Sequence, residues 1–99
     1  MTGKIEYTFT APLWKYAGKG GWYFVSLPEA FSREIRSNLQ WQESGWGRMP
    51  ATAEVSRRSW STAIWYDTGR GTYLLPVKKD IRMGTGMAEG DEIAVRLTL

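Results

Sequence analysis

The sequence GTYLLP at residues 71–76, followed by Ile81-Arg82, decides how this chain folds, because an earlier stretch repeats its pattern. The earlier stretch reads YFVSLP at residues 23–28 and is followed by Ile35-Arg36. Each predicts a strand that ends at Leu-Pro and leads into a short helix, since proline cannot donate to a sheet and its fixed φ suits a first helical turn. We expect a loose internal duplication, in which two units related by a twofold axis share one barrel.

The segments around these units predict the other strands. Apolar and polar residues alternate in segments 4–13, 49–56 and 93–99, as in half-buried strands, and residues 60–66 are rich in strand formers. Six strands and two short helices predict a mainly β fold, a small barrel that leaves no long exposed edge. We expect residues 1–99 to form one domain.

Two helices and one loop complete the expected elements. Apolar residues recur every four positions after Pro28, which predicts an amphipathic helix, and they are Phe31, Ile35 and Leu39. Ser32 is a candidate N-cap for the regular part of this helix. The second helix is expected at residues 77–83, and residues 40–48, which have no period, predict a loop that carries two tryptophans.

The hairpin between residues 49–56 and 60–66 has an unusual tip, Arg57-Arg58. A two-residue turn normally needs Gly or Asn, which accept positive φ. We therefore expect a longer turn that includes Ser56 and Ser59.

Composition excludes several kinds of chemistry. The chain has neither cysteine nor histidine, which rules out disulfides, thiolate or Ser-His catalysis, and zinc sites built on sulfur. The sequence shows neither a glycine-rich phosphate loop nor a cluster of metal ligands, so we expect no cofactor and no metal site. The net charge of +3 permits contact with a polyanion without requiring it. No apolar run has the length of a signal peptide or membrane span, so a cytoplasmic location is expected.

Nearly the whole chain resembles the bacterial family called domain of unknown function 1905. The motifs that carry the resemblance are FTAPLW at residues 9–14, GW at 21–22, VSLP at 25–28, GWG at 45–47, WST at 60–62, YLLPVK at 73–78, Ile81-Arg82 and Gly90-Asp91. The family is similar to double-split β-barrels, so the resemblance implies that fold. Two positions depart from the family pattern: Ala63 stands where a serine is usual, and Arg57-Arg58 stand at a tip that is usually rich in glycine.

The second unit also resembles the swapped-hairpin pattern of the AbrB and MazE class of bacterial DNA-binding domains. The shared features are Leu75-Pro76, a helix ending at Arg82, and the Gly90-Asp91 turn. In that class two chains complete one barrel, whereas here one chain would contain both halves.

Basic residues lie on one face of each expected helix. Lys78 and Arg82 are four positions apart, and Arg33 and Arg36 are three apart. These faces are candidate anion sites. The alternative is that the arginines form ion pairs, Arg82 with Asp91 and Arg36 with Glu34 or Glu43, and surface pairs of this kind are common and weak.

Aromatic residues offer a second kind of site, because aromatic faces bind ligands by stacking. The candidates for a ligand cleft are Trp14, Trp22, Trp46, Trp60 and Trp65. We expect Trp22 and Trp60 to lie in the core. Trp41 and Trp46, in the loop beside Arg48, are equally suited to binding or packing.

We therefore expect a non-catalytic module that binds a small anionic or aromatic ligand, or a protein partner, in a cleft between the two helices. The candidate binding residues are Arg36, Trp46, Arg48, Trp60, Thr62, Lys78 and Arg82. A nucleic-acid-binding regulator is the alternative, because Arg57, Arg58 and Arg70 lie in turns that could meet a phosphate backbone. An enzyme using carboxylate or lysine chemistry ranks third, with Glu43, Asp67, Lys78 and Asp80 as its polar groups.

Overall fold

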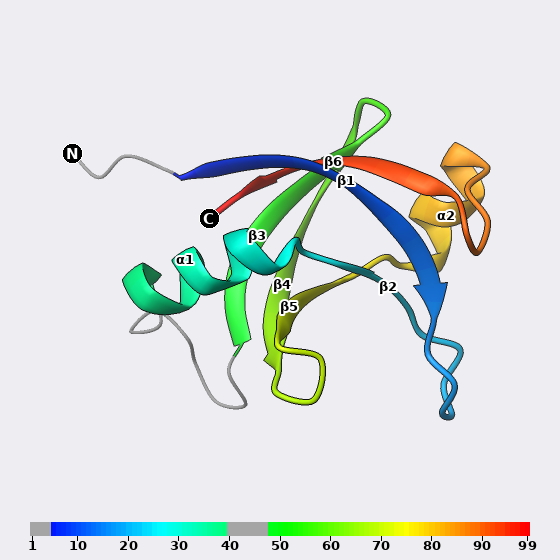
Figure 1. Ribbon diagram of the computed structural model, residues 1–99. Helices are drawn as coiled ribbons and strands as arrows, with labels where there is room; N and C mark the ends of the chain where they lie inside the picture. Colours follow the sequence, from blue (N-terminus) through cyan, green and yellow to red (C-terminus); the bar gives the residue numbers. More distant parts are fainter. Residues whose placement is uncertain (1–4, 40–47) are drawn as a thin grey trace.

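The computed structural model describes residues 5–39 and 48–99 as six strands and two helices (Figure 1). In chain order the elements are β1 (Glu6–Lys15), β2 (Tyr23–Ser26), α1 (Glu29–Leu39), β3 (Arg48–Val55), β4 (Arg58–Asp67), β5 (Thr72–Pro76), α2 (Lys79–Thr85) and β6 (Glu92–Thr98). The six strands close into an antiparallel barrel in the order β1-β2-β5-β4-β3-β6. The predicted mainly β barrel with two short helices is confirmed. No described helix is long and apolar enough to cross a membrane.

The expected alternation builds the core. Every second residue of β1 points into the barrel, and Tyr7, Phe9, Ala11 and Leu13 are all buried. Ile93, Val95 and Leu97 of β6 face them from the neighbouring strand. Burying these side chains supplies most of the driving force for folding.

The barrel has the twofold arrangement that the repeated units predict. Exchanging β1 with β4, β2 with β5 and β3 with β6 leaves the strand order unchanged. Two matching hydrogen bonds cross the centre, from the Leu27 amide to the Tyr73 carbonyl and from the Val77 amide to the Tyr23 carbonyl, each 3.0 Å long. Equivalent residues here are therefore fifty positions apart, and α1 and α2 also begin fifty positions apart.

This equivalence corrects the sequence-based match of Arg36 with Arg82. The Leu-Pro motifs are offset by two residues in the structure, because Pro28 follows β2 whereas Pro76 is still paired with Phe24 inside the sheet. Ser32 is therefore the equivalent of Arg82. Pro76 also delays the second helix, which begins at Lys79 rather than at residue 77.

Ser32 is not the expected N-cap, because α1 begins three residues earlier, at Glu29. Its side chain is fully buried, and its Oγ accepts a hydrogen bond of 3.1 Å from the Tyr73 amide. The bond satisfies a buried backbone donor of β5 from outside the sheet, which ties α1 to that strand.

The β3–β4 turn is shorter than expected. Val55 pairs with Arg58, so the tip consists only of Ser56 and Arg57, with φ of 51° and 67°. Both residues take the left-handed conformation that a two-residue hairpin turn requires, although neither is Gly or Asn. Arg58 and Ser59 belong to β4, and the ladder with β3 outweighs the local preference.

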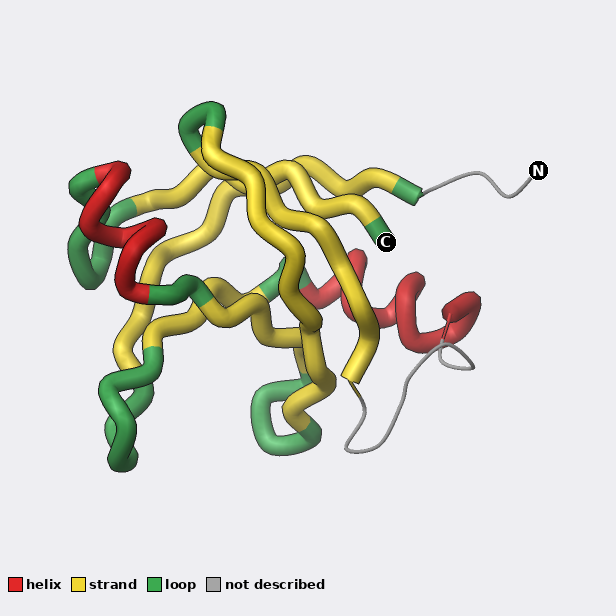
Figure 2. The backbone as a smooth tube through the Cα atoms, turned by 180° about the vertical axis from the view of Figure 1, so that it is seen from behind, coloured by secondary structure: helices red, strands yellow, loops and turns green. Residues whose placement is uncertain are grey.

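Two strand pairs are incomplete, which splits the barrel twice. β1 pairs with β2 only at residues 13–15, and β4 pairs with β5 only at residues 65–67. We call the opening between residues 6–12 of β1 and helix α1 the α1 split. The equivalent opening between residues 58–64 of β4 and helix α2 is the α2 split. Viewed from behind, the two helices lie on opposite sides of the barrel (Figure 2).

Candidate functional site

The α2 split contains a pocket of about 840 Å³, within the usual range for small-ligand sites. The β1–β2 turn, the start of β3, the middle of β4 and the residues from Pro76 to Arg82 surround it. Its lining residues are Gly20, Gly21, Trp22, Tyr23, Arg48, Trp60, Ser61, Thr62, Ala63, Trp65, Pro76, Val77, Lys78, Lys79 and Arg82. No residue of α1 contributes, so the expected cleft between the two helices is wrong: the twofold axis places the helices on opposite sides.

The pocket nevertheless brings together five of the seven candidate binding residues, namely Arg48, Trp60, Thr62, Lys78 and Arg82. Arg36 lies elsewhere, with its guanidinium 4.1 Å from the centre of the Tyr66 ring. Trp46, Trp41 and Glu43 fall outside the described residues.

Positive charge dominates the pocket. Arg48, Lys78, Lys79 and Arg82 line it, and its described lining includes neither Asp nor Glu. Arg82 does not form the expected ion pair with Asp91, whose Oδ2 instead accepts a hydrogen bond of 2.8 Å from the Ala88 amide. An anionic group entering this pocket would therefore meet several cations along its described walls.

Arg82 is held in place by two contacts. Its guanidinium lies 3.8 Å from the centre of the Tyr23 ring, and its Nε donates a hydrogen bond of 3.3 Å to the Val77 carbonyl. A cation over an aromatic face is attracted by the ring quadrupole, so Tyr23 orients this side chain. Arg48 lies 5.9 Å from the centre of the Trp65 ring in the same way.

Aromatic side chains form the other walls. Trp60 is only 7% exposed, as expected for a core residue, yet part of it reaches the pocket. Trp22 is 50% exposed, so the prediction that it lies in the core is wrong. It precedes β2 and follows Gly20 and Gly21, both at positive φ, and this turn directs its ring outward.

The free edge of β4 faces the pocket. Pro50 of β3 is opposite Ala63, and because proline has no N–H these two residues form a non-hydrogen-bonded pair. The N–H and C=O of Ala63 therefore point away from β3. By alternation those of Ser61 and Ser59 point the same way. Among the described strands, none pairs with this part of the β4 edge, since β5 pairs only from Trp65 onward.

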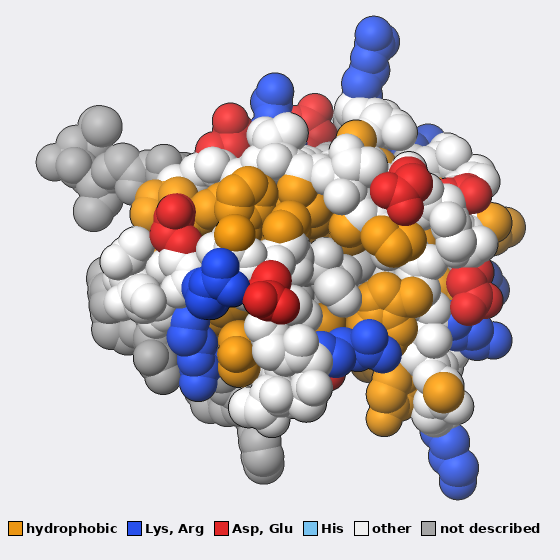
Figure 3. Space-filling view, in the orientation of Figure 1, with side chains coloured by type: hydrophobic (Ala, Val, Ile, Leu, Met, Phe, Trp, Pro, Cys, Tyr) orange, Lys and Arg blue, Asp and Glu red, His pale blue; other side chains and the backbone are white. Residues whose placement is uncertain are grey.

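A second aromatic surface adjoins the pocket on the outside of the barrel. It consists of Trp14, Tyr16, Trp22, Phe24 and Trp65, with Leu74, Asp67 and Arg70 beside them, around a cavity of about 300 Å³. Trp22 and Trp65 line both cavities. In the space-filling view, apolar side chains gather where β1 ends and β2 begins, with basic side chains among them (Figure 3).

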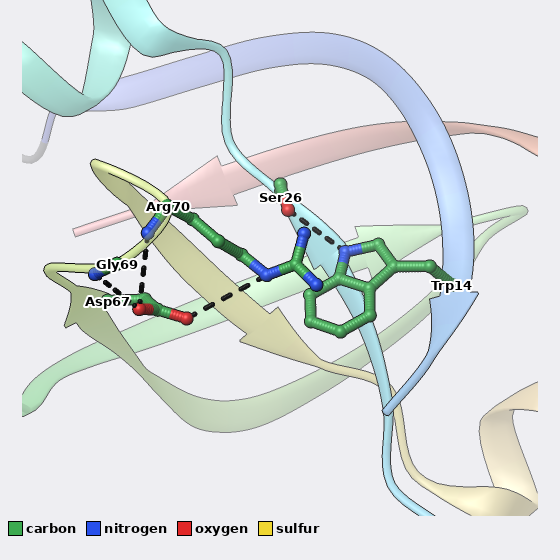
Figure 4. Close-up of polar contacts among 5 residues, drawn as sticks. All are labelled: Trp14, Ser26, Asp67, Gly69 and Arg70. Atoms are coloured by element: carbon green, nitrogen blue, oxygen red, sulfur yellow. Dashed lines mark hydrogen bonds and ion pairs between the residues drawn. The ribbon is translucent and has the colours of Figure 1, made fainter. Parts of the chain in front are cut away.

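Arg70 crosses this outer surface (Figure 4). Its guanidinium lies 3.8 Å from the centre of the Trp14 ring, while its Nε is 3.8 Å from Oδ2 of Asp67. Trp14 donates a hydrogen bond of 2.9 Å from Nε1 to Oγ of Ser26, which fixes the indole under the arginine.

Asp67 and Asp80, two of the carboxylates named for enzyme chemistry, accept hydrogen bonds from nearby backbone amides. Asp67 accepts hydrogen bonds from the amides of Gly69 and Arg70 and so holds the β4–β5 turn. Asp80 accepts one from the Ile81 amide. Within the described parts of the chain, no three acidic side chains gather to hold a metal ion.

Tyr7, in the α1 split, has a strongly shifted pKa. Burial, together with a 2.7 Å hydrogen bond to the Glu34 carboxylate, raises the pKa of Tyr7 to about 12. The bond also shows that Glu34, an expected partner of Arg36, has another role.

The pocket includes residues that the sequence did not single out. Tyr23, Lys79 and Ser61 line it, and the β4 backbone presents its edge there. Lys79 adjoins Lys78, so the basic pair was a usable signal. The side to which the N–H and C=O groups of β4 point depends on its register with β3. Pro50, which lacks an N–H, was the signal in the sequence for that register.

The family model described as "Domain of unknown function (DUF1905)" matches residues 9–97. No curated protein matches the chain. The match takes in most or all of every strand and both helices, while the resemblance to the swapped-hairpin class stays a prediction.

Proposed function

This chain belongs to the family of the domain of unknown function 1905, and we propose that it is a binding module whose α2 split holds an anionic ligand with an aromatic group. One observation carries the proposal: four basic and four aromatic side chains line one pocket, without a carboxylate among its described lining residues. A charged group desolvated beside cations and a ring stacked on indole are both favourable there.

The two parts of the ligand would use different walls. Lys78, Lys79 and Arg82 would bind the anionic group, since charge-assisted hydrogen bonds are the strongest that such side chains form. Trp22 and Trp65 would stack on the planar group. The hydroxyl groups of Ser61 and Thr62 add hydrogen-bonding capacity beside them.

Titration with small probes tests this proposal. Indole-3-acetate and phenyl phosphate should bind saturably in isothermal titration calorimetry, whereas the uncharged indole-3-ethanol should bind much more weakly. Lys78→Ala should weaken binding about 3- to 10-fold, the loss expected for one hydrogen bond in a pocket open to water. Lys19→Ala is the matched control, because it removes the same charge from a residue that does not line the pocket. Equal affinity for the charged and uncharged probes would exclude an anion site.

Nucleic acid is the second candidate ligand, and the outer aromatic surface favours it. Base stacking on exposed aromatic rings beside arginines is how many proteins hold single strands. Trp22 and Tyr16 are about half exposed there, at 50% and 48%. Titration with single-stranded and duplex DNA at several salt concentrations checks this, and a lack of salt-dependent binding would remove it.

A further inference from the structure

We propose that the α2 split binds the C-terminal segment of a partner protein as an added strand on the free edge of β4, with the terminal carboxylate held by the pocket's basic side chains. This inference rests on the proposed function, because it names the ligand of the same pocket. It adds backbone recognition, which a small aromatic anion would not use.

The β4 edge offers the hydrogen bonds that such a strand needs. Ser59, Ser61 and Ala63 each direct an N–H and a C=O away from β3, as the opposed Pro50 requires. Ser61 and Ala63 also line the pocket, so their backbone is open to a ligand. An extended segment that pairs with an exposed edge gains affinity from these main-chain groups and specificity from alternate side chains.

The α1 split shows how this fold blocks the same edge. The pairs Trp14–Phe24 and Trp65–Leu74 are equivalent, so Pro12 of β1 is the counterpart of Ala63. Proline removes the N–H that an added strand would use. In the α2 split that N–H is present.

The geometry favours a chain end over an internal segment. From Trp65 onward β5 occupies the edge of β4, so an added strand must stop beside Ala63. Arg48 is opposite Trp65 in the ladder, and Lys78 comes two residues after Pro76. Arg48 and Lys78 line the same pocket as Ala63, so a chain end there meets cations, which attract a carboxylate and repel an N-terminal amine. The C-terminal residue of the segment therefore lies beside Ala63 and its earlier residues lie beside Ser61 and Ser59. The segment thus runs parallel to β4.

The rings of Trp22 and Trp65 lie at the same end of the pocket as this stopping point. An aromatic side chain on the last residue of the segment would stack there while the carboxylate meets Lys78 or Arg48. The expected ligand is thus an extended C-terminal peptide with an aromatic last residue.

A peptide array provides the test. The array holds five-residue peptides ending in Phe, Tyr or Trp, with the other positions randomised, each as free acid and as C-terminal amide. We expect a subset of the free acids to bind, with their amides at least about 10-fold weaker. N-methylation of alternate backbone amides in a binding peptide should weaken it at least about 10-fold, because it removes donors without altering the protein.

Substitutions at equivalent positions supply the matched comparison. Ala63→Pro should weaken the peptide at least about 10-fold relative to the parent chain. Pro12→Ala, at the counterpart position in the α1 split, should leave peptide affinity unchanged. Thermal unfolding checks that each variant folds. If Ala63→Pro does not fold, the N-methylated peptides still test whether the peptide binds as an added strand.

The outcomes separate the two proposals. If indole-3-acetate binds but no free-acid peptide does, the peptide proposal is overturned and the pocket proposal stands. If neither binds, both fail. Peptides that bind equally as amides or after N-methylation overturn strand addition. Salt-dependent binding of an oligonucleotide in place of any peptide, or a concentration-dependent dimer abolished by Ala63→Pro, would assign the edge to another occupant and overturn the proposal.

Discussion

The two splits of the barrel have equivalent positions and opposite contents. In the α1 split the Phe31 ring packs against Tyr7 and Phe9, with ring centroids 5.1 and 6.3 Å apart, and Glu34 accepts a hydrogen bond from the Tyr7 hydroxyl. In the α2 split the equivalent stretch of β4 borders a pocket lined by cations. One split is thus part of the core and the other is an open pocket. The difference comes from side chains, because the strand order is the same around both.

The largest expected effect comes from emptying the closed split. Phe31→Ala should lower the free energy of unfolding by about 2–3 kcal/mol, since it removes a ring packed on two others and leaves a cavity. Thr62→Ala, its control in the α2 split, should change it by less than about 1 kcal/mol. Urea denaturation measures both. Similar losses at the two positions would break the contrast between a packed and an open split.

A smaller effect, dependent on pH, comes from Tyr7. Its pKa is raised from 10.0 to about 12 in the folded chain, so the folded state holds the proton more tightly than the unfolded state. The resulting stabilisation is complete below pH 10 and is lost as the pH rises toward 12.

Tyr7→Phe removes this contribution and the hydrogen bond to Glu34. We expect the variant to be less stable than the parent chain below pH 10, with the difference shrinking between pH 10 and 12. Denaturation at a series of pH values records the difference in the free energy of unfolding between the two chains. A difference that stays constant across that window would show that the phenol has no linked proton.

The smallest effect concerns the hairpin that carries the open split. Ser56 and Arg57 both have positive φ, which glycine and asparagine adopt at lower energy. The double substitution S56N/R57G, which places an Asn-Gly pair at the tip, should raise the free energy of unfolding by about 0.5–1 kcal/mol. Ligand affinity should not change, because neither residue lines the pocket. Thermal unfolding and the probe titration test the two halves of this prediction.

Sequence patterns predicted the parts of the molecule that depend on local periodicity. Alternation at Tyr7, Phe9, Ala11 and Leu13 reports burial directly, because side chains on a strand point to opposite faces in turn. The Leu-Pro repeats predicted the twofold arrangement, because each repeat marks the end of a strand and the start of a helix. They could not predict the two-residue offset, since Pro76 occupies a position inside the sheet, opposite Phe24, that its sequence context does not reveal.

The candidate site was predicted in composition and misplaced in space. Lys78 and Arg82 share a helical face, so their joint presence in the pocket could be expected. Their partners Trp60 and Thr62 come from β4, across an unpaired gap that no local pattern encodes. Trp22 was misassigned because an aromatic residue beside a buried strand has the same pattern whether it packs inward or outward.

The ladder between β1 and β6 has a consequence for the order in which the chain folds. Glu6 pairs with Thr98 and Pro12 with Glu92, so the barrel closes through residues far apart in the sequence. Such non-local pairing slows folding, because a long loop must be ordered before any contact compensates for it. During synthesis β1 must wait, with one apolar face exposed, until β6 has left the ribosome. The hairpins β1–β2 and β3–β4 can form earlier, and a nascent chain stalled before residue 92 would be the form most prone to aggregate.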